Sequence, residues 1–117
     1  MEASTVTGGK LVRDLIPNLI QNSGRRAEVR HLTGQALVAA LAAKLCEEAQ
    51  EVSEAVGSRE HLIEELADLR QVISALMTVC GISDQEVTGV AVAKAEELGA
   101  FDSGAWLVSP ELKADRR

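Results

Sequence analysis

The segment from Thr33 to Gly81, TGQALVAALAAKLCEEAQEVSEAVGSREHLIEELADLRQVISALMTVCG, determines the fold. Gly57-Ser58 divides it into two halves, and each half carries one apolar series at helical spacing. Thr33 can cap the first helix and Ser58 the second, so we predict two long helices in a tight antiparallel hairpin. The two series are Leu37, Leu41, Leu45, Val52 and Val56 in the first half, and Leu62, Leu66, Leu69, Ile73, Leu76 and Cys80 in the second.

The flanking segments predict shorter helices. Pro17 interrupts the segment 10–21, which indicates a helical turn before the proline and a short helix after it. Alternating side chains favour an extended segment over residues 25–32. Ser83 and Glu86 stand in capping-box register and predict a third helix that ends at Gly99. We expect residues 1–9 to form a flexible tail, and residues 10–117 to form a single all-α domain.

The composition agrees with packed helices. A chain of 117 residues fits one domain, and its 46% hydrophobic residues include only one Phe and one Trp. Such a core is built from aliphatic side chains, which suit helices better than sheets. A long two-helix hairpin cannot bury both of its faces alone, so we expect a homodimer or a higher homo-oligomer that forms a helical bundle.

The net charge of -6 and a pI near 4.9 argue against nucleic-acid binding, which needs a basic surface. The N-terminus carries neither a charged and apolar leader nor a long apolar span, so we expect a cytoplasmic protein without a membrane partner. Two cysteines make neither a disulfide framework nor a zinc site. We interpret Cys46 and Cys80 as free thiols that serve as small buried side chains.

Acidic residues on the two long helices are placed symmetrically about the turn. Glu48 lies ten residues before position 58 and Asp68 ten after it, whereas Glu51 and Glu65 lie seven before and seven after. In an antiparallel hairpin these pairs should therefore lie level with each other. Helices about 8 to 10 Å apart leave room for two carboxylates and a metal ion between them.

Glu48 falls on the apolar register of the first helix, where packing would favour leucine. Carboxylates brought so close together repel one another unless a cation separates them. Hard divalent cations prefer oxygen ligands, so we expect Mg²⁺ first and Mn²⁺ second. From spacing alone, a solvated charged face is an equally good interpretation. A di-iron site is disfavoured because neither His31 nor His61 follows a Glu by three residues, and we expect no chemical role for either histidine.

Two of these segments resemble a known family. EEAQE at 47–51 followed by EELAD at 64–68 is similar to the E-E-x-x-E and E-x-x-D signature of the all-α, MazG-like nucleotide pyrophosphohydrolases. KLVRDLIP at 10–17 and KAEELGAF at 94–101 resemble a phosphoribosyl-ATP pyrophosphohydrolase-like subgroup. The segments occur in the same order as in that subgroup, and the resemblance covers roughly residues 10–107.

The resemblance implies roles for particular side chains. Mg²⁺ ligands would be Glu48, Glu51, Glu65 and Asp68, and Glu47 would be a further ligand or the base that orients water, so that Glu47, Glu48 and Glu51 form the catalytic group. Lys10, Arg13 and Lys94 would hold phosphate oxygens. Two positions depart from the family pattern: Leu98-Gly99-Ala100-Phe101 stands where relatives often have Arg-Gly-Gly-Phe, and Leu15 stands where they often have Lys.

The expected function is Mg²⁺-dependent hydrolysis of a nucleoside triphosphate between the α and β phosphates, which removes unwanted nucleotides and yields a monophosphate and pyrophosphate. An alternative substrate is phosphoribosyl-ATP in histidine synthesis. An alternative of another class is a helical dimerisation module without catalytic activity.

Overall fold

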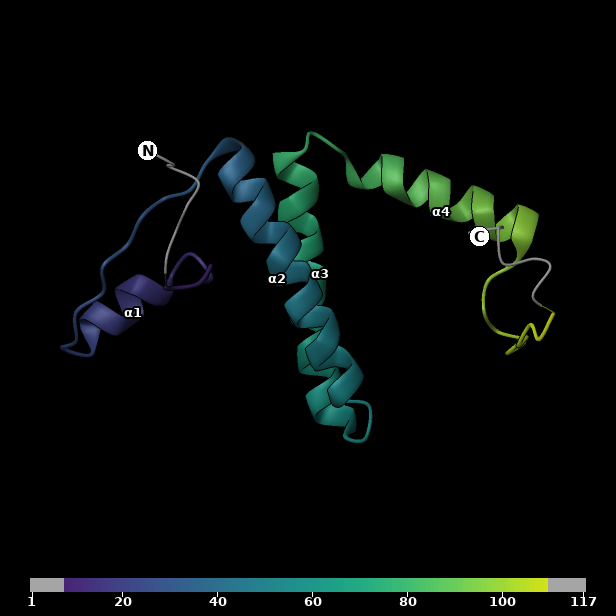
Figure 1. The fold of residues 1–117 in the computed structure, drawn as a ribbon, viewed down its shortest axis with the longest axis horizontal. Coiled ribbons are helices and arrows are strands. Elements are labelled where there is room, and N and C mark those ends of the chain that lie inside the picture. Colours follow the sequence, from purple (N-terminus) through teal and green to yellow (C-terminus); the bar gives the residue numbers. More distant parts are fainter. Residues whose placement is uncertain (1–7, 110–117) are drawn as a thin grey trace. The chain divides into compact units, whose positions relative to one another are not determined.

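In the computed structural model, which describes residues 8–109, those residues form four helices and no strand (Figure 1). The helices are α1 (Ile16–Asn22), α2 (Gly34–Glu54), α3 (Arg59–Val79) and α4 (Asp84–Leu98). The predicted all-α fold is confirmed. The chain divides into two compact units, Met1–Asp84 and Gln85–Arg117, so the hairpin and the segment after it are described separately.

Helices α2 and α3 pack side by side as the predicted antiparallel hairpin (Figure 1). Each has 21 residues and is therefore about 31 Å long. The turn between them covers residues 55–58, and the Ser58 hydroxyl accepts a hydrogen bond from the His61 backbone N–H at 3.4 Å. No single described helix is long and apolar enough to cross a membrane, and only α3 and α4 taken together pass that test, on length and composition alone.

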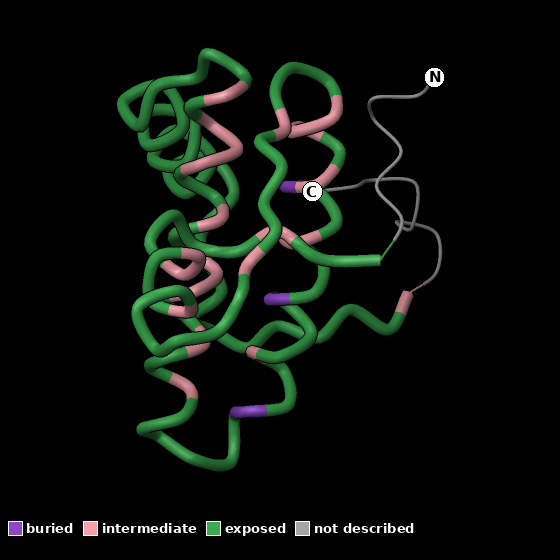
Figure 2. The backbone as a smooth tube through the Cα atoms, turned by 90° about the vertical axis from the view of Figure 1, so that its left-hand side faces the viewer, coloured by how far each residue is buried: buried purple, intermediate pink, exposed green. Residues whose placement is uncertain are grey.

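The seam between α2 and α3 is narrow. Among the described residues only Leu41, Glu48 and Ala55 are buried, and they recur at seven-residue steps along one face of α2 and its C-cap. Figure 2 colours the buried residues purple. A seven-residue step returns a helix to nearly the same direction, so this face meets α3 along its whole length. The half-buried residues of α3 are Leu62, Glu65, Asp68, Leu69, Val72, Ala75, Leu76, Met77 and Val79.

The predicted apolar series was wrong at several positions. Leu66 is 47% exposed and Ile73 40% exposed, and Val56 and Cys80 are also exposed. Each residue turns a helix by about 100°, so Leu66 points away from the direction taken by its neighbour Glu65. The seam contains Glu65 where the sequence pattern favoured the leucine.

The flanking segments agree in part with the prediction. Helix α1 begins at Ile16 and holds Pro17 within its first turn, rather than following the proline. Residues 25–32 form neither a helix nor a paired strand. Helix α4 ends at Leu98, next to Gly99 with a φ of 83°, as predicted. Most of the predicted tail, residues 1–7, lies outside the described residues.

The expectation of buried thiols was wrong, because Cys46 and Cys80 are both exposed. A helix turns by about 100° per residue, and Cys46 is two residues before Glu48 and five after Leu41. Cys46 therefore lies on nearly the opposite side of α2 from both. Cys80 caps the C-terminus of α3. Neither position belongs to the seam.

Replacing Leu41 by alanine should lower the free energy of unfolding by roughly 2 to 4 kcal/mol, because Leu41 is one of the two buried apolar residues in the described part of the chain. Leu19→Ala is the matched control, since Leu19 is 60% exposed and should cost less than about 0.5 kcal/mol. Urea denaturation followed by circular dichroism measures both. Equal losses in the two variants would contradict this assignment of the core.

Candidate metal centre

Acidic side chains from both helices converge on the hairpin. Glu48, Glu65 and Asp68 each offer a carboxylate oxygen within 4.8 Å of the others, and Glu47, Glu48 and Glu51 do the same. Glu48 belongs to both groups. The predicted convergence across the hairpin is therefore present for Glu48, Glu65 and Asp68, whereas Glu47 and Glu51 are exposed to solvent.

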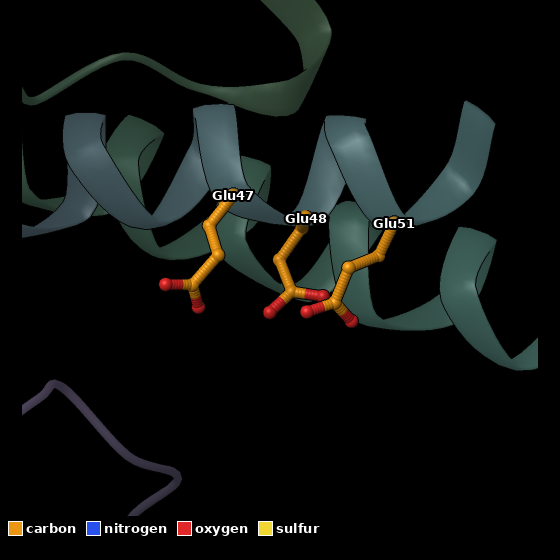
Figure 3. A group of neighbouring side chains, drawn as sticks. All are labelled: Glu47, Glu48 and Glu51. Carbon is orange, nitrogen blue, oxygen red and sulfur yellow. The ribbon is translucent and has the colours of Figure 1, made fainter. Parts of the chain in front are cut away.

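The three glutamates of α2 leave the same side of the helix, as Figure 3 shows. Glu47 and Glu51 are exposed, whereas Glu48 is only 6% exposed. The α2 part of the site thus passes from solvent into the seam within one helical turn.

Two carboxylate oxygens are buried and lack a partner. Glu48 Oε1 and Glu65 Oε1 accept no hydrogen bond within the described structure. A buried carboxylate oxygen without a donor is costly, because the hydration that it loses is not replaced. A cation bound between the helices would supply the missing interaction.

Lys44 lies one turn before Glu48 on α2. Its Nζ is 3.1 Å from Glu47 Oε1 and 3.5 Å from Glu48 Oε2. Partial burial of the ammonium lowers the pKa of Lys44, but the hydrogen bonds and negative charges of Glu47 and Glu48 together outweigh that effect and raise it. Lys44 therefore stays charged and offsets part of the local negative charge.

Two further basic side chains contact the acidic residues of α3. Arg13 donates to Asp68 Oδ1 at 2.7 Å, which links the segment before α1 to the hairpin. His61 Nε2 lies 3.1 Å from Glu65 Oε2. His61 is 56% exposed near the start of α3, so the expectation that it has no chemical role stays a prediction, whereas its contact with Glu65 was not predicted. The sequence does carry a signal for this contact, because the four-residue spacing of His61 and Glu65 places both side chains on one helix face.

Glu51 has a pKa above its ordinary value of 4.5. The main cause is that a protonated Glu51 can donate a hydrogen bond to the carboxylate of Glu65, and the second is the negative charge of Glu65. Loss of hydration and the charge of Glu47 act in the same direction, whereas Lys44 opposes them. The two largest causes both come from Glu65, a residue of the neighbouring helix α3.

These donors fit a divalent cation. Three carboxylates from two helices lie within 4.8 Å of one another, and two of them hold a buried oxygen without a partner. Oxygen-only donor sets suit hard cations, and no histidine or cysteine lies in either group.

The other predicted phosphate ligands are not brought to the site by a described contact. Lys10 is exposed in the segment before α1, and Lys94 is exposed on α4, in the second unit. Phe101 and Trp106 lie in that second unit too and are 95% and 88% exposed. Of the three predicted phosphate-binding side chains, only Arg13 is shown in contact with a predicted metal ligand.

The family model described as phosphoribosyl-ATP pyrophosphohydrolase matches residues 18–94, roughly two-thirds of the 117 residues. This chain belongs to the phosphoribosyl-ATP pyrophosphohydrolase family. It is a nucleotide pyrophosphohydrolase, a hydrolase that acts on phosphoanhydride bonds, in agreement with the MazG-like resemblance of its acidic segments. No curated protein and no solved structure matches it.

Family membership decides between the classes of function considered above. The match includes both acidic segments of this pyrophosphohydrolase and ends at Lys94, so the hairpin with its carboxylates is the part that the family shares. An enzyme is therefore favoured over a helical module without catalytic activity. Lys10 and Arg13 lie before the matched residues.

In the metal-free protein, Glu51→Gln should become more stable relative to the wild type as the pH rises above 4.5. The raised pKa means that the folded chain binds the Glu51 proton more tightly than the unfolded chain, so this carboxyl's contribution to stability falls as the pH rises through the folded pKa. Glutamine cannot ionise, so the variant does not lose this contribution to stability as the pH rises. Urea denaturation in a chelator, at several pH values from 4.5 to neutral, measures the difference.

Glu54→Gln is the control for this pH series, because Glu54 lies on the same helix but outside both acidic groups. A difference between Glu51→Gln and the wild type that stays constant across the pH range would contradict the close Glu51–Glu65 contact.

Proposed function

We propose that this protein is a Mg²⁺-dependent nucleoside triphosphate pyrophosphohydrolase that cleaves between the α and β phosphates. The observation that carries the proposal is the pair of buried carboxylate oxygens without partners, Glu48 Oε1 and Glu65 Oε1, in a seam where three carboxylates converge. Glu48, Glu51, Glu65 and Asp68 would hold the cation, with Mn²⁺ as a substitute. The family of the chain supports the reaction class.

A divalent cation in this site would neutralise phosphate charge and lower the pKa of a bound water. The protein's own side chains then have separate tasks. Glu48 and Glu65 hold their carboxylates in the seam, away from bulk water. Glu47, which is exposed at the edge of the group, can accept a proton from a water held beside it. The guanidinium of Arg13 lies beside Asp68 and can donate two parallel hydrogen bonds to the oxygens of a phosphate.

The family description favours phosphoribosyl-ATP as a second candidate substrate. Both candidates carry a triphosphate on a nucleoside, and both reactions release pyrophosphate. They differ in the group attached to the base, and the hairpin carboxylates would act on the shared phosphates in either case. The flanking cations Lys10, Arg13 and Lys94 are the side chains that we propose for phosphate contacts.

The purified protein should release pyrophosphate and a monophosphate from at least one member of a panel of nucleoside triphosphates and phosphoribosyl-ATP, only when Mg²⁺ or Mn²⁺ is present. Glu65→Gln should lower kcat/KM by roughly 100-fold or more, since it removes a ligand charge from the centre. Glu64→Gln is the matched control, because Glu64 is the exposed neighbour outside both groups and should change kcat/KM less than about twofold.

Release of single phosphate, or pyrophosphate release that persists in excess chelator, would contradict the proposed reaction. A kcat/KM for phosphoribosyl-ATP far above that for every triphosphate would assign the second candidate substrate instead.

We also propose that the active form is a homodimer. The outward face of α3 carries Ile63, Leu66 and Ile73, which are 40% to 52% exposed. An open hollow of about 460 Å³ on this face is lined by Ile63, Leu66, Ala67, Arg70, Gln71 and Ser74. The described residues bury only Leu41 and Ala55 as apolar side chains, so a second apolar surface has to be covered for a stable protein.

Leu66→Glu should shift the protein from dimer to monomer in light scattering after size exclusion at micromolar concentration, because a charge would enter the apolar interface. Leu19→Glu, on α1, is the control and should remain dimeric. A wild-type protein that is monomeric at tens of micromolar would contradict the proposed dimer.

A further inference from the structure

The two oxygens of Glu65 have different surroundings. Oε2 lies 3.1 Å from the Nε2 atom of His61, whereas Oε1 is buried and accepts no hydrogen bond within the described structure. The side chain of Glu65 is only 12% exposed, and that of His61 is 56% exposed. The imidazole therefore approaches the carboxylate from the solvent side and leaves the inner oxygen free.

Glu48 shows the same arrangement on the other helix. Its Oε2 lies 3.5 Å from Lys44 Nζ, and its Oε1 is buried without a partner. Lys44 precedes Glu48 by four residues, as His61 precedes Glu65, so each basic side chain stands one helical turn before its carboxylate. In both helices a basic side chain lies beside one carboxylate oxygen, and the other oxygen is buried without a partner.

We propose that His61 is a positioning residue of the metal centre. By donating a hydrogen bond to Glu65 Oε2, it fixes the rotamer of Glu65 so that Oε1 is presented to the cation. This inference rests on the proposed function, because it assigns His61 a task at the same site. Side chains that orient metal ligands change metal affinity without touching the metal.

The contact needs a donor at one position rather than a charge. A carboxylate can only accept, so Nε2 must carry the hydrogen, and both the neutral Nε2–H tautomer and the protonated ring provide it. A glutamine at position 61 can donate its amide N–H to a carboxylate four residues later, whereas alanine cannot. Comparing the glutamine and alanine variants therefore tests whether a hydrogen-bond donor at position 61 is needed.

The test is the affinity of the full-length protein for Mn²⁺, measured by titration calorimetry and by electron paramagnetic resonance without any substrate. His61→Ala should raise the dissociation constant for Mn²⁺ by about tenfold. This is the lower end of the range that is typical when a group that orients a metal ligand is lost. His61→Gln should restore most of that affinity. His31→Ala is the control, since His31 is the other histidine and is exposed outside both acidic groups.

A double substitution makes the assignment specific. In a Glu65→Ala background, His61→Ala should cause no further loss of Mn²⁺ affinity, because the carboxylate that His61 orients is already absent. The thermal stability of the metal-free His61→Ala protein should change little, since the imidazole is more than half exposed. A merely structural role would lower that stability and leave the affinity per folded molecule unchanged.

The outcomes separate this inference from the function on which it depends. A wild-type protein that binds no Mn²⁺ would overturn the metal centre and the role of His61 together. A wild type that binds Mn²⁺ while His61→Ala binds equally tightly would overturn the positioning role alone. Failure of His61→Gln to exceed His61→Ala in affinity would also overturn it.

Discussion

The placement of carboxylates in the seam of a helical hairpin is the constraint on which this structure depends. Glu48 is one of three buried residues in the described chain and occupies the helix face that Leu41 and Ala55 share. Burying a carboxylate removes its hydration, and neighbouring carboxylates add repulsion. The fold therefore gives up packing energy at its centre, and the cation that we propose would compensate for this loss.

Basic side chains around the seam offset part of the negative charge of the carboxylates. Lys44, His61 and Arg13 each contact one of the three central carboxylates, always at one oxygen of that carboxylate. Partial neutralisation from outside lowers the repulsion while the inner oxygens of Glu48 and Glu65 remain available. Arg13 and His61 are more than half exposed, so their contacts contribute little to stability.

The hairpin and its flanks carry different parts of the function. The family match covers residues 18–94 and includes all the converging carboxylates, so the hairpin supplies the shared hydrolysis of a phosphoanhydride. Arg13 lies outside the match and yet bonds to Asp68. Leu98 and Ala100, where the chain departs from the resembling sequences, follow it at the other end. Substrate preference is therefore the property that we expect the flanks to set, because they differ while the carboxylates are kept.

The sequence alone determined the helices, the turn near position 58 and the level pairing of acidic residues, because these follow from local spacing and from the symmetry of an antiparallel hairpin. It did not determine which of two adjacent residues enters the seam. Glu65 lies there and Leu66 does not, since the rotation of α3 about its axis is fixed by packing against α2. The contact of Arg13 with Asp68 also depends on the tertiary structure, which brings together two residues 55 positions apart in the sequence.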